Sequence, residues 1–235
     1  MLSEPAQLRA AMAYTSYIAH AASTLTVQGR LETRGLPPTL RGGLLAVEDA
    51  GGAGADAEET ARTIAQLCVQ RSFRGTVLTA AAPRERLCLP LAGALERALE
   101  TAGRRLLVSE VYASDVERAA VVVGTALSGG DLRGRLEACT GRWGAERLAV
   151  RVERTRMDFP IPCPTGEGRP LTQEQLHALA RGHSIFFSEP LCARYFTCSA
   201  GGAPHFVLFD DEETLRQKSF PHDKEFWRIL HFLQT

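Results

Sequence analysis

Five polar residues stand at or near the predicted carboxyl ends of short apolar segments, where barrel enzymes carry their catalytic groups. Carboxylic acids that face one cleft can act as general acid and general base. Hydroxyl groups beside them can contact a ligand through hydrogen bonds. We therefore take these residues as the candidate site, and they are Asp49, Thr79, Glu110, Tyr112 and Glu153.

Glu110 is the most informative of these acids because it interrupts an otherwise apolar segment, "LLVSEVY". If the segment is a strand, Glu110 shares a face with Val108 and Tyr112. It then points into a barrel mouth if that face is the barrel interior. The alternatives are an ion pair with an arginine such as Arg151, a ligand contact, or a catalytic acid.

The other acids also have structural explanations. Asp49 follows Glu48 at the end of one apolar segment and can cap the loop that comes next through its side chain. Glu153 lies between Arg151 and Arg154, which favours an ion pair. A site role remains the alternative for each of these acids.

Apolar segments of strand length alternate with helical patterns. Asp56, with Glu59 three residues later, indicates the start of one helix, and Gly103 indicates the end of another. Continuous apolar strands separated by helices are typical of a parallel sheet covered by helices. We expect an α/β fold, a TIM-barrel-like (β/α)8 derivative. The predicted strands are 17–27, 42–49, 75–80, 104–112, 119–126 and 147–153.

The sequence changes character after the last of these strands. Residues 157–170 are rich in Pro and Gly and are predicted to form a loop, after which Thr172 caps a short helix. "RYFTCS" and "HFVLFD", joined by "AGGAP", predict a β-hairpin insertion near the C-terminus. The last segment carries an apolar stripe that predicts a helix. Its members are Phe226, Ile229, Leu230 and Leu233.

The predicted domain organisation is a single degenerate barrel-like domain spanning residues 1–235. The barrel core covers about 17–153, and the hairpin and C-terminal helix cover about 184–235.

In this order, the segments resemble the catalytic barrel of the family 18 glycoside hydrolases, especially its bacterial spore-associated branch. "FRGTVLTAA" stands where the family carries F-D-G-[VI]-D-x-D-x-E, with Phe73 and Gly75 matching. "RYFTCSAGGAPHFVLFDDEETLRQK" matches the family's Y-x-Y-T…H-x-V-W-F-x-D-x-x-S-x-x-x-K pattern. The matching residues there are Tyr195, Thr197, His205, Val207, Phe209, Asp211, Leu215 and Lys218.

The departures from the family pattern affect its chemistry directly. Arg74, Val77, Thr79 and Ala81 occupy the positions of the family's four acids. In the family, the acetamido oxygen of the substrate attacks the anomeric carbon, so that no protein nucleophile is needed. A carboxylic acid must still protonate the leaving oxygen, and none of these four side chains can do so. The resemblance thus implies a barrel without the family's catalytic acid.

Further departures concern the strands of the barrel. The sixth-strand Tyr-Asp of the family corresponds to Ala126 and Leu127. The first strand is absent or reduced in the pattern, and the closing strand has no counterpart after Lys218. Trp227 falls on the predicted C-terminal helix, as a core residue rather than a sugar platform. We therefore expect a barrel that is incomplete or closed in a different way.

Other motifs have simpler explanations. His205 lies on a predicted hairpin strand, as a packed or hydrogen-bonded residue rather than a base. "TALSGGDL" could bind an anion at a helix start, or could be a glycine-rich turn in which Asp131 caps the helix. "TGEGRP" follows no strand-to-helix turn and does not predict a phosphate site.

The charge balance and the cysteine content limit the kinds of partner and cofactor that we expect. Lys plus Arg and Asp plus Glu both number 27, so the zero net charge argues against nucleic acid and acidic membranes as partners. The six cysteines form no C-x-x-C pair, which argues against zinc and is typical of a reducing compartment. We expect a cytoplasmic protein with no cofactor and no metal, and with a glycan or protein partner. Self-association is possible through exposed sheet edges.

Two functional hypotheses follow. The preferred one is a non-catalytic, family 18-like protein that acts by binding a glycan or a protein. The rival is an active glycoside hydrolase on N-acetylglucosamine-containing glycans that uses a relocated acid such as Glu110 or Asp49.

Overall fold

The computed structural model describes residues 18–33, 41–219 and 228–234. Within these ranges the chain forms two compact units, each of which is considered by itself. The first unit takes the residues up to 123, 140–151 and 228–234, and the second takes 124–139 and 152–219. Residues 124–139, which the sequence analysis counts in the barrel core, therefore cluster with the second unit.

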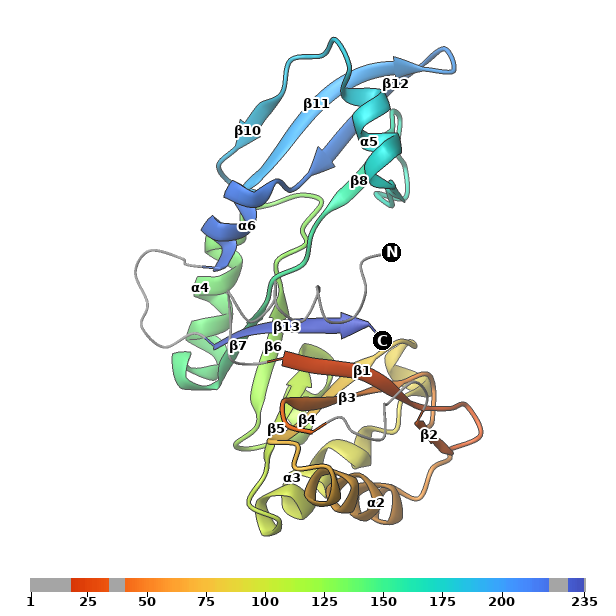
Figure 1. Cartoon of the computed structure of the whole chain (residues 1–235), viewed down its shortest axis with the longest axis vertical. Helices are drawn as coiled ribbons and strands as arrows, with labels where there is room; N and C mark the ends of the chain where they lie inside the picture. Colours follow the sequence, from red (N-terminus) through yellow and green to blue (C-terminus); the bar gives the residue numbers. More distant parts are fainter. Residues whose placement is uncertain (1–17, 34–40, 220–227, 235) are drawn as a thin grey trace. The chain divides into compact units, whose positions relative to one another are not determined.

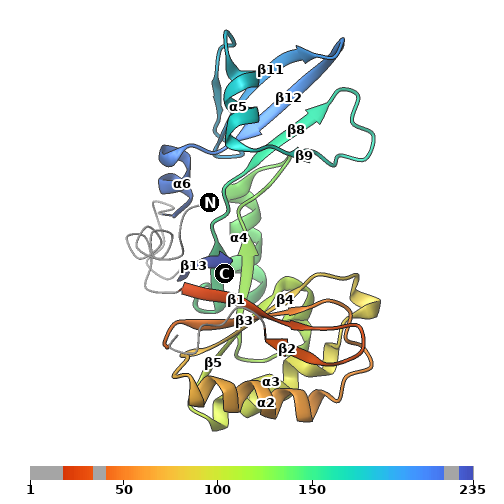
Figure 2. The same cartoon turned by 45° about the vertical axis from the view of Figure 1, so that its right-hand side comes forward.

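The first unit is built on seven parallel strands that close into a ring (Figures 1 and 2). β13 pairs with β7 on one side and with β1 on the other, which closes the ring, and the short β2 (Leu31–Thr33) runs antiparallel to β1. A complete (β/α)8 barrel has eight parallel strands, so this barrel is incomplete. The seven are β1 (Ile18–Leu25), β3 (Leu44–Asp49), β4 (Gly75–Ala80), β5 (Arg105–Ser109), β6 (Ala120–Gly124), β7 (Leu148–Arg151) and β13 (Arg228–Gln234).

Two helices cover the outside of these strands, α2 (Ala57–Gln70) and α3 (Leu89–Thr101) (Figure 1). Asp56 caps α2 as predicted, since its Oδ1 accepts a hydrogen bond from the Glu59 N–H at 2.9 Å. Three short 3₁₀ helices complete the unit: η1 (Arg84–Arg86), η2 (Glu110–Asp115) and η3 (Ala145–Arg147).

The alternation of side chains along the strands separates two apolar layers. Leu45 and Val47 of β3 pack in a cluster with α2 and α3, whereas Leu44 and Ala46 belong to a second cluster inside the ring. This interior cluster draws on six strands. Its members are Ala19, Leu44, Ala46, Val77, Leu107, Ala120, Val122 and Ala149.

The second unit is a five-stranded antiparallel sheet with helices beside it. The sheet order is β10 (Phe186–Ser188), β11 (Ala193–Ala200), β12 (Ala203–Phe209), β8 (Arg156–Pro160) and β9 (Arg169–Pro170). α5 (Gln173–Ala180) packs on one face, where Leu176 contacts Phe196 and Val207. α4 (Leu132–Trp143) and α6 (Glu212–Ser219) are the remaining helices in the described ranges.

The predicted hairpin and its neighbouring helix are confirmed. β11 and β12 pair through Ala200 and Ala203, and Gly201 and Gly202 between them both have positive φ (58° and 81°). A tight turn with two positive φ values matches the twist of the flanking strands. Thr172 makes the complete capping box with Gln175 at the start of α5.

The helix predicted for the C-terminal segment is wrong where the structure describes that segment. Residues 228–234 form β13, and this strand closes the ring that was expected to lack a closing strand. The apolar pattern of this segment is compatible both with one face of a helix and with a strand in a parallel sheet. The segment is a strand because it pairs with β1 on one side and β7 on the other. Phe226 and Trp227 lie outside the described residues.

Two other predicted elements differ from the structure. The segment 157–170 is not all loop, because β8 pairs with β12 and β9 adds to β8. Pro170 is tolerated there because β9 is an edge strand, where a missing N–H leaves no ladder bond unmade. The strand predicted through Tyr112 ends at Ser109, and Glu110 begins the 3₁₀ helix η2.

Candidate functional site

Four of the five predicted site residues, Asp49, Thr79, Glu110 and Tyr112, belong to the first unit. Of these, the structure brings Asp49 and Tyr112 together. The Tyr112 hydroxyl donates a hydrogen bond to Asp49 Oδ2 at 3.0 Å, and both side chains are fully buried.

Asp49 is held by a set of hydrogen bonds. Its Oδ1 accepts from the N–H groups of Gly51 (3.0 Å) and Gly52 (2.8 Å), which belong to the loop after β3. Its Oδ2 accepts from the Cys88 N–H (2.7 Å) as well as from Tyr112. These four donors occupy the acceptor capacity of a carboxylate, so Asp49 joins two loops to η2.

The contact with Asp49 also determines the chemistry of Tyr112. Burial, together with the charge of Asp49 and the hydrogen bond to it, raises the pKa of the Tyr112 phenol far above its ordinary value. The phenol therefore stays protonated and donates to Asp49. A proton held so firmly is unsuited to acid catalysis near neutral pH.

The orientation of Glu110 depends on which face of β5 is the interior. Val108 and Tyr112, the residues expected to share its face, pack in the cluster between the sheet and the helices. Leu107 is the β5 residue in the interior cluster. The condition under which Glu110 would point into the barrel mouth is therefore not met, and the half-buried Glu110 begins η2.

β4 is the strand that the sequence analysis compares with the family's catalytic strand. Val77 lies in the interior cluster, and alternation places Thr79 and Ala81 on the same face. The Thr79 hydroxyl donates to the Val47 carbonyl at 3.4 Å, and the Ala81 N–H donates to the Asp49 carbonyl at 2.9 Å. Arg74 precedes the strand, at its opposite end.

The residues of this segment that do match the family have structural roles. Phe73 is fully buried. A Cβ on Gly75 would lie 2.0 Å from the Arg105 carbonyl oxygen, so only glycine allows β4 and β5 to approach at this point. The match at Phe73 and Gly75 thus reports the packing of the barrel and not its chemistry.

Three of the matched C-terminal residues, His205, Asp211 and Lys218, make contacts within the second unit. Lys218 Nζ lies 2.8 Å from Asp210 Oδ1, and both side chains are almost fully buried. Asp211 caps α6, since its Oδ1 accepts from the Thr214 N–H at 2.8 Å. His205 Nδ1 contacts Asp158 Oδ1 at 2.8 Å.

Burial alone would raise the pKa of Asp211, but the Thr214 N–H and the guanidinium of Arg194 hold it below the ordinary value of a carboxyl group. Asp211 therefore stays charged at the helix start, where a negative charge is favourable.

Glu153, the fifth predicted residue, lies in the second unit, where it lines a cavity of about 580 Å³. Two segments that lie far apart in the sequence meet here: 126–128, which precedes Gly129 and Gly130, and the glycine-rich 166–168. Met157, Phe159 and Leu208 form an apolar part of the lining, and charged groups include Arg154 and Glu167. The remaining lining residues are Thr155, Arg156, Pro170 and Leu171.

Two residues of the cavity wall are closely packed. Thr155 is buried, and its hydroxyl oxygen has no hydrogen-bond partner among the described residues. Gly168 packs directly against the ring of Phe159, so a Cβ at this position would come within 2.7 Å of the ring.

The start of α4 already carries a carboxylate. Asp131 caps this helix, and its Oδ2 accepts a hydrogen bond from the Gly134 N–H at 3.0 Å.

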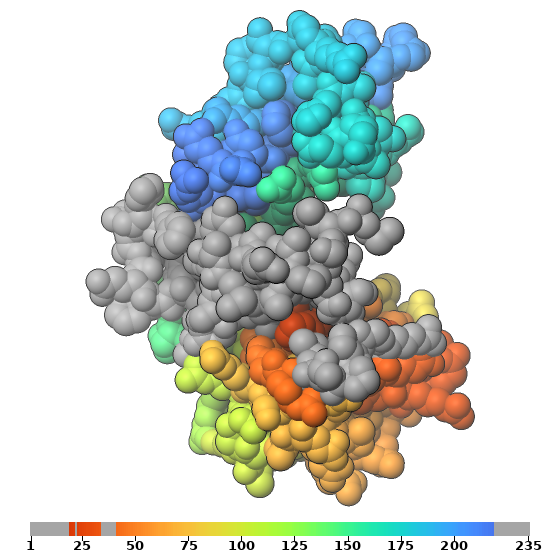
Figure 3. All heavy atoms as spheres, viewed as in Figure 1, coloured from red at the N-terminus to blue at the C-terminus, as the bar shows by residue number. Residues whose placement is uncertain are grey.

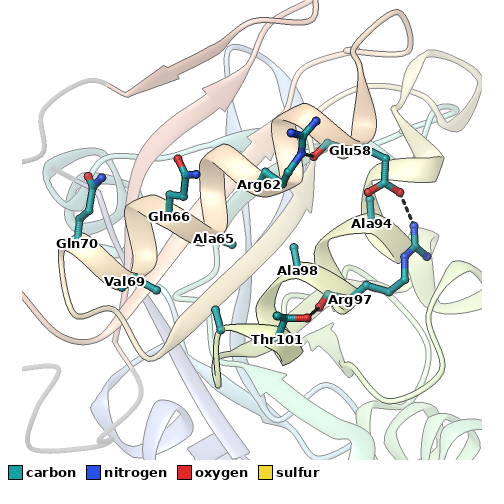
Figure 4. Close-up of a pocket in the computed structure, with 11 residues that line it drawn as sticks. Glu58, Arg62, Ala65, Gln66, Val69, Gln70, Ala94, Arg97, Ala98 and Thr101 are labelled. Atoms are coloured by element: carbon teal, nitrogen blue, oxygen red, sulfur yellow. Dashed lines mark hydrogen bonds and ion pairs between the residues drawn. The ribbon is translucent and has the colours of Figure 1, made fainter.

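A second hollow, of about 560 Å³, lies between α2 and α3 (Figure 4). Small residues such as Ala65 and Ala98 line it, and Glu58 and Arg97 form an exposed ion pair at 2.6 Å along its edge. An exposed pair of this kind adds little stability. This hollow brings together no acid, base and nucleophile.

No metal site or membrane span emerges from the described ranges. They contain no cluster of three or more His, Cys, Asp or Glu side chains placed to hold a metal ion. None of the helices described is long and apolar enough to cross a membrane. The six cysteines all lie in the described ranges, and none of them forms a disulfide there.

The fold is that of chitinase-like barrels. A chitinase from Chromobacterium violaceum superposes with a TM-score of 0.73 at 16% identity, over 100% of this chain and 91% of that one. The Bacillus megaterium spore cortex-lytic enzyme SleL gives 0.70 at 14%, over 100% and 67%. A family GH18 chitinase from C. violaceum gives 0.58 at 9%, over 93% and 62%. No family model and no curated protein sequence matches this chain.

These likenesses establish the TIM-barrel-like α/β fold that the sequence predicts. The fold alone does not decide between catalysis and binding, so that choice depends on the residues of this chain.

Proposed function

We propose that this protein is a non-catalytic relative of the family 18 glycoside hydrolases and acts by binding a glycan. The observation that carries the proposal is the interior face of β4. Val77 lies in the interior cluster, Thr79 and Ala81 continue the same face, and none of these side chains carries a carboxyl group.

The lack of a carboxyl group at Val77, Thr79 and Ala81 should reduce the rate of glycoside hydrolysis strongly. Leaving-group protonation by a placed acid contributes about 10²–10⁴ to the rate, and preorganised charges near the acetamido group add to that. Valine, threonine and alanine supply neither. Asp49 does not replace them, because its carboxylate oxygens are saturated by four donors.

The cavity of the second unit supports binding as the retained activity. A sugar ring has apolar C–H faces and polar edges, and such a ligand suits an apolar lining with a few polar groups. Phe159 and Leu208 supply the apolar part, and Arg154 and Glu153 supply the polar part.

Titration calorimetry with chitin and peptidoglycan oligosaccharides tests this proposal. We expect binding to the wild-type protein and an approximately tenfold weaker Kd for Arg154→Gln, which removes an exposed charged group of the cavity lining. The matched control is Arg30→Gln, which changes an exposed arginine of the first unit and should bind like the wild type. Absence of binding to every oligosaccharide would overturn the glycan ligand and leave a protein partner as the alternative.

A second candidate function, hydrolysis with a relocated acid, is favoured by one observation. Leu44 and Ala46 of β3 face the interior, and alternation places Glu48 on that same face. Glu48 pairs in register with Thr79 of β4, and it is exposed. The acid beside the vacated position is therefore Glu48, rather than Asp49 or Glu110.

Turnover separates the two functions. Hydrolysis of chitin oligosaccharides that is abolished by Glu48→Gln, but not by the matched exposed variant Glu85→Gln, would establish the hydrolase. Binding without turnover supports the first proposal.

A further inference from the structure

The antiparallel sheet of the second unit has two edges of opposite character (Figure 1). One edge is β9, which consists of Arg169 and Pro170. The other edge is β10, which contains no charge and no proline. Edge strands present unpaired N–H and C=O groups, and proteins usually protect them with charges or proline. The chain protects β9 in this way and leaves β10 unprotected.

The side chains at β10 are apolar and accessible. Ile185, Phe186 and Phe187 are consecutive, with exposed fractions of 49%, 53% and 37%. They account for half of the exposed large hydrophobic residues among the described residues. Figure 3 shows the cyan-to-blue residues of this part of the chain at the surface of the second unit. A run of this kind on an open edge favours pairing with another strand.

We propose that β10 pairs antiparallel with β10 of a second copy of this chain. A two-fold axis through Phe186 places Phe186 opposite its own equivalent and Ile185 opposite the partner's Phe187. Directly opposed aromatic and β-branched residues are favourable cross-strand pairs. The arrangement is isologous and therefore closes as a dimer.

Charge complementarity supports a second copy as the occupant. Arg181 and Glu189 lie in the turns that flank β10, and His183 lies between the first turn and the strand. This register brings Arg181 and His183 of one copy towards Glu189 of the other, beyond the paired strands. All three residues are exposed, and His183 is held by stacking on Phe196, with ring centroids 5.9 Å apart. The two-fold axis forms each contact twice, so the segment 181–189 is complementary to itself.

The pairing also extends an aromatic row. Phe186 contacts Tyr195 with ring centroids at 5.6 Å, and Tyr195 contacts Phe206 at 5.4 Å. Phe206 in turn contacts Phe159 at 6.3 Å. The rows of the two copies would meet at Phe186, so the interface buries the outermost ring of each row.

Sedimentation equilibrium tests this inference and does not depend on whether the protein binds a glycan. We expect a dimer for the wild-type protein and a Kd at least tenfold weaker for Phe186→Lys, because two lysines would then oppose each other. Val69→Lys is the matched control, since Val69 is an equally exposed hydrophobic residue on α2 (50%), and it should leave the dimer intact. A far-ultraviolet circular dichroism spectrum like that of the wild type shows that each variant folds.

A charge exchange tests the register. Glu189→Lys should weaken the dimer, and the triple variant Glu189→Lys/Arg181→Glu/His183→Glu should restore it. A monomeric wild type at all accessible concentrations, or a dimer that survives Phe186→Lys, would overturn the proposal. A dimer lost on Glu189→Lys but not restored by the exchange would overturn the register.

Discussion

Asp49 is an acid at the end of a barrel strand, where catalytic acids often lie, but its carboxylate is fully used in structural hydrogen bonds. It ends β3 on the face that meets the helices, and its two oxygens accept hydrogen bonds from three backbone N–H groups and from Tyr112. Glu48, its neighbour in the chain, takes the other face and is exposed. At the scale of single residues, the direction of a side chain decides its role.

This difference predicts opposite effects of two amide substitutions. Asp49→Asn places an amide nitrogen against a backbone donor, and we expect a loss of about 1–3 kcal/mol in the free energy of unfolding. Glu48→Gln at the exposed neighbouring position should change it by less than about 0.5 kcal/mol. Urea denaturation measures both, and an unchanged stability of Asp49→Asn would show that these hydrogen bonds do not support the fold.

Tyr112 predicts a pH dependence at alkaline pH. Because its pKa is raised in the folded state, its contribution is fully present below the ordinary phenol pKa of about 10 and is lost as pH rises above that value. Above pH 10 the wild type should lose about 1.4 kcal/mol per pH unit more than Tyr112→Phe. The buried thiols are the same in both proteins, so the comparison isolates the phenol. A constant difference between pH 8 and pH 11 would contradict this account.

At the scale of elements, α6 is fixed to the sheet by a buried ion pair. Asp210 follows β12, and its carboxylate binds Lys218 Nζ, the Thr214 hydroxyl and the Thr155 N–H. Thr214 and Lys218 lie one turn apart on α6, and both bind Asp210, which precedes the helix. The resemblance in this segment thus reflects the attachment of a helix.

Removal of one partner of this pair should be costly. Lys218→Met leaves the Asp210 charge buried, and we expect a loss of about 3–5 kcal/mol in the free energy of unfolding. Asp210→Asn/Lys218→Met should lose less than the sum of the single variants, because no uncompensated charge remains. The exposed pair Arg97–Glu58 provides the control, and Arg97→Met should cost less than about 1 kcal/mol. Equal costs at the two sites would show that burial is not the cause.

The sequence predicts elements well where local signals are strong. The caps at Asp56 and Thr172 and the glycines of the hairpin turn each carry their own local chemistry. Residues 228–234 could not be assigned in this way, since their apolar pattern fits two structures and only pairing with distant strands decides.

The site was harder to predict for a related reason. Alternation shows that Glu48 and Asp49 face opposite ways, but it does not show which face is the interior. The cavity combines the segments 126–128 and 166–168, which only the folded chain brings together. In the sequence these segments are parts of "TALSGGDL" and "TGEGRP", and neither motif alone predicts a cavity.

At the scale of the whole molecule, the ring of seven strands explains the composition of the interior. A barrel becomes narrower as its number of strands falls. Four of the eight described members of the interior cluster are alanines: Ala19, Ala46, Ala120 and Ala149. The barrel is packed with small apolar side chains, and it contributes structure to a protein whose proposed activity is binding.

The central claim is that the protein binds a glycan without cleaving it, because no residue at the end of β4 can protonate a leaving group and no other acid replaces the missing one. The most direct measurement is a turnover assay on chitin and peptidoglycan oligosaccharides, with products separated by chromatography, at protein concentrations that saturate binding. The account predicts bound oligosaccharide that is recovered intact. Released sugar whose formation depends on Glu48 would contradict it.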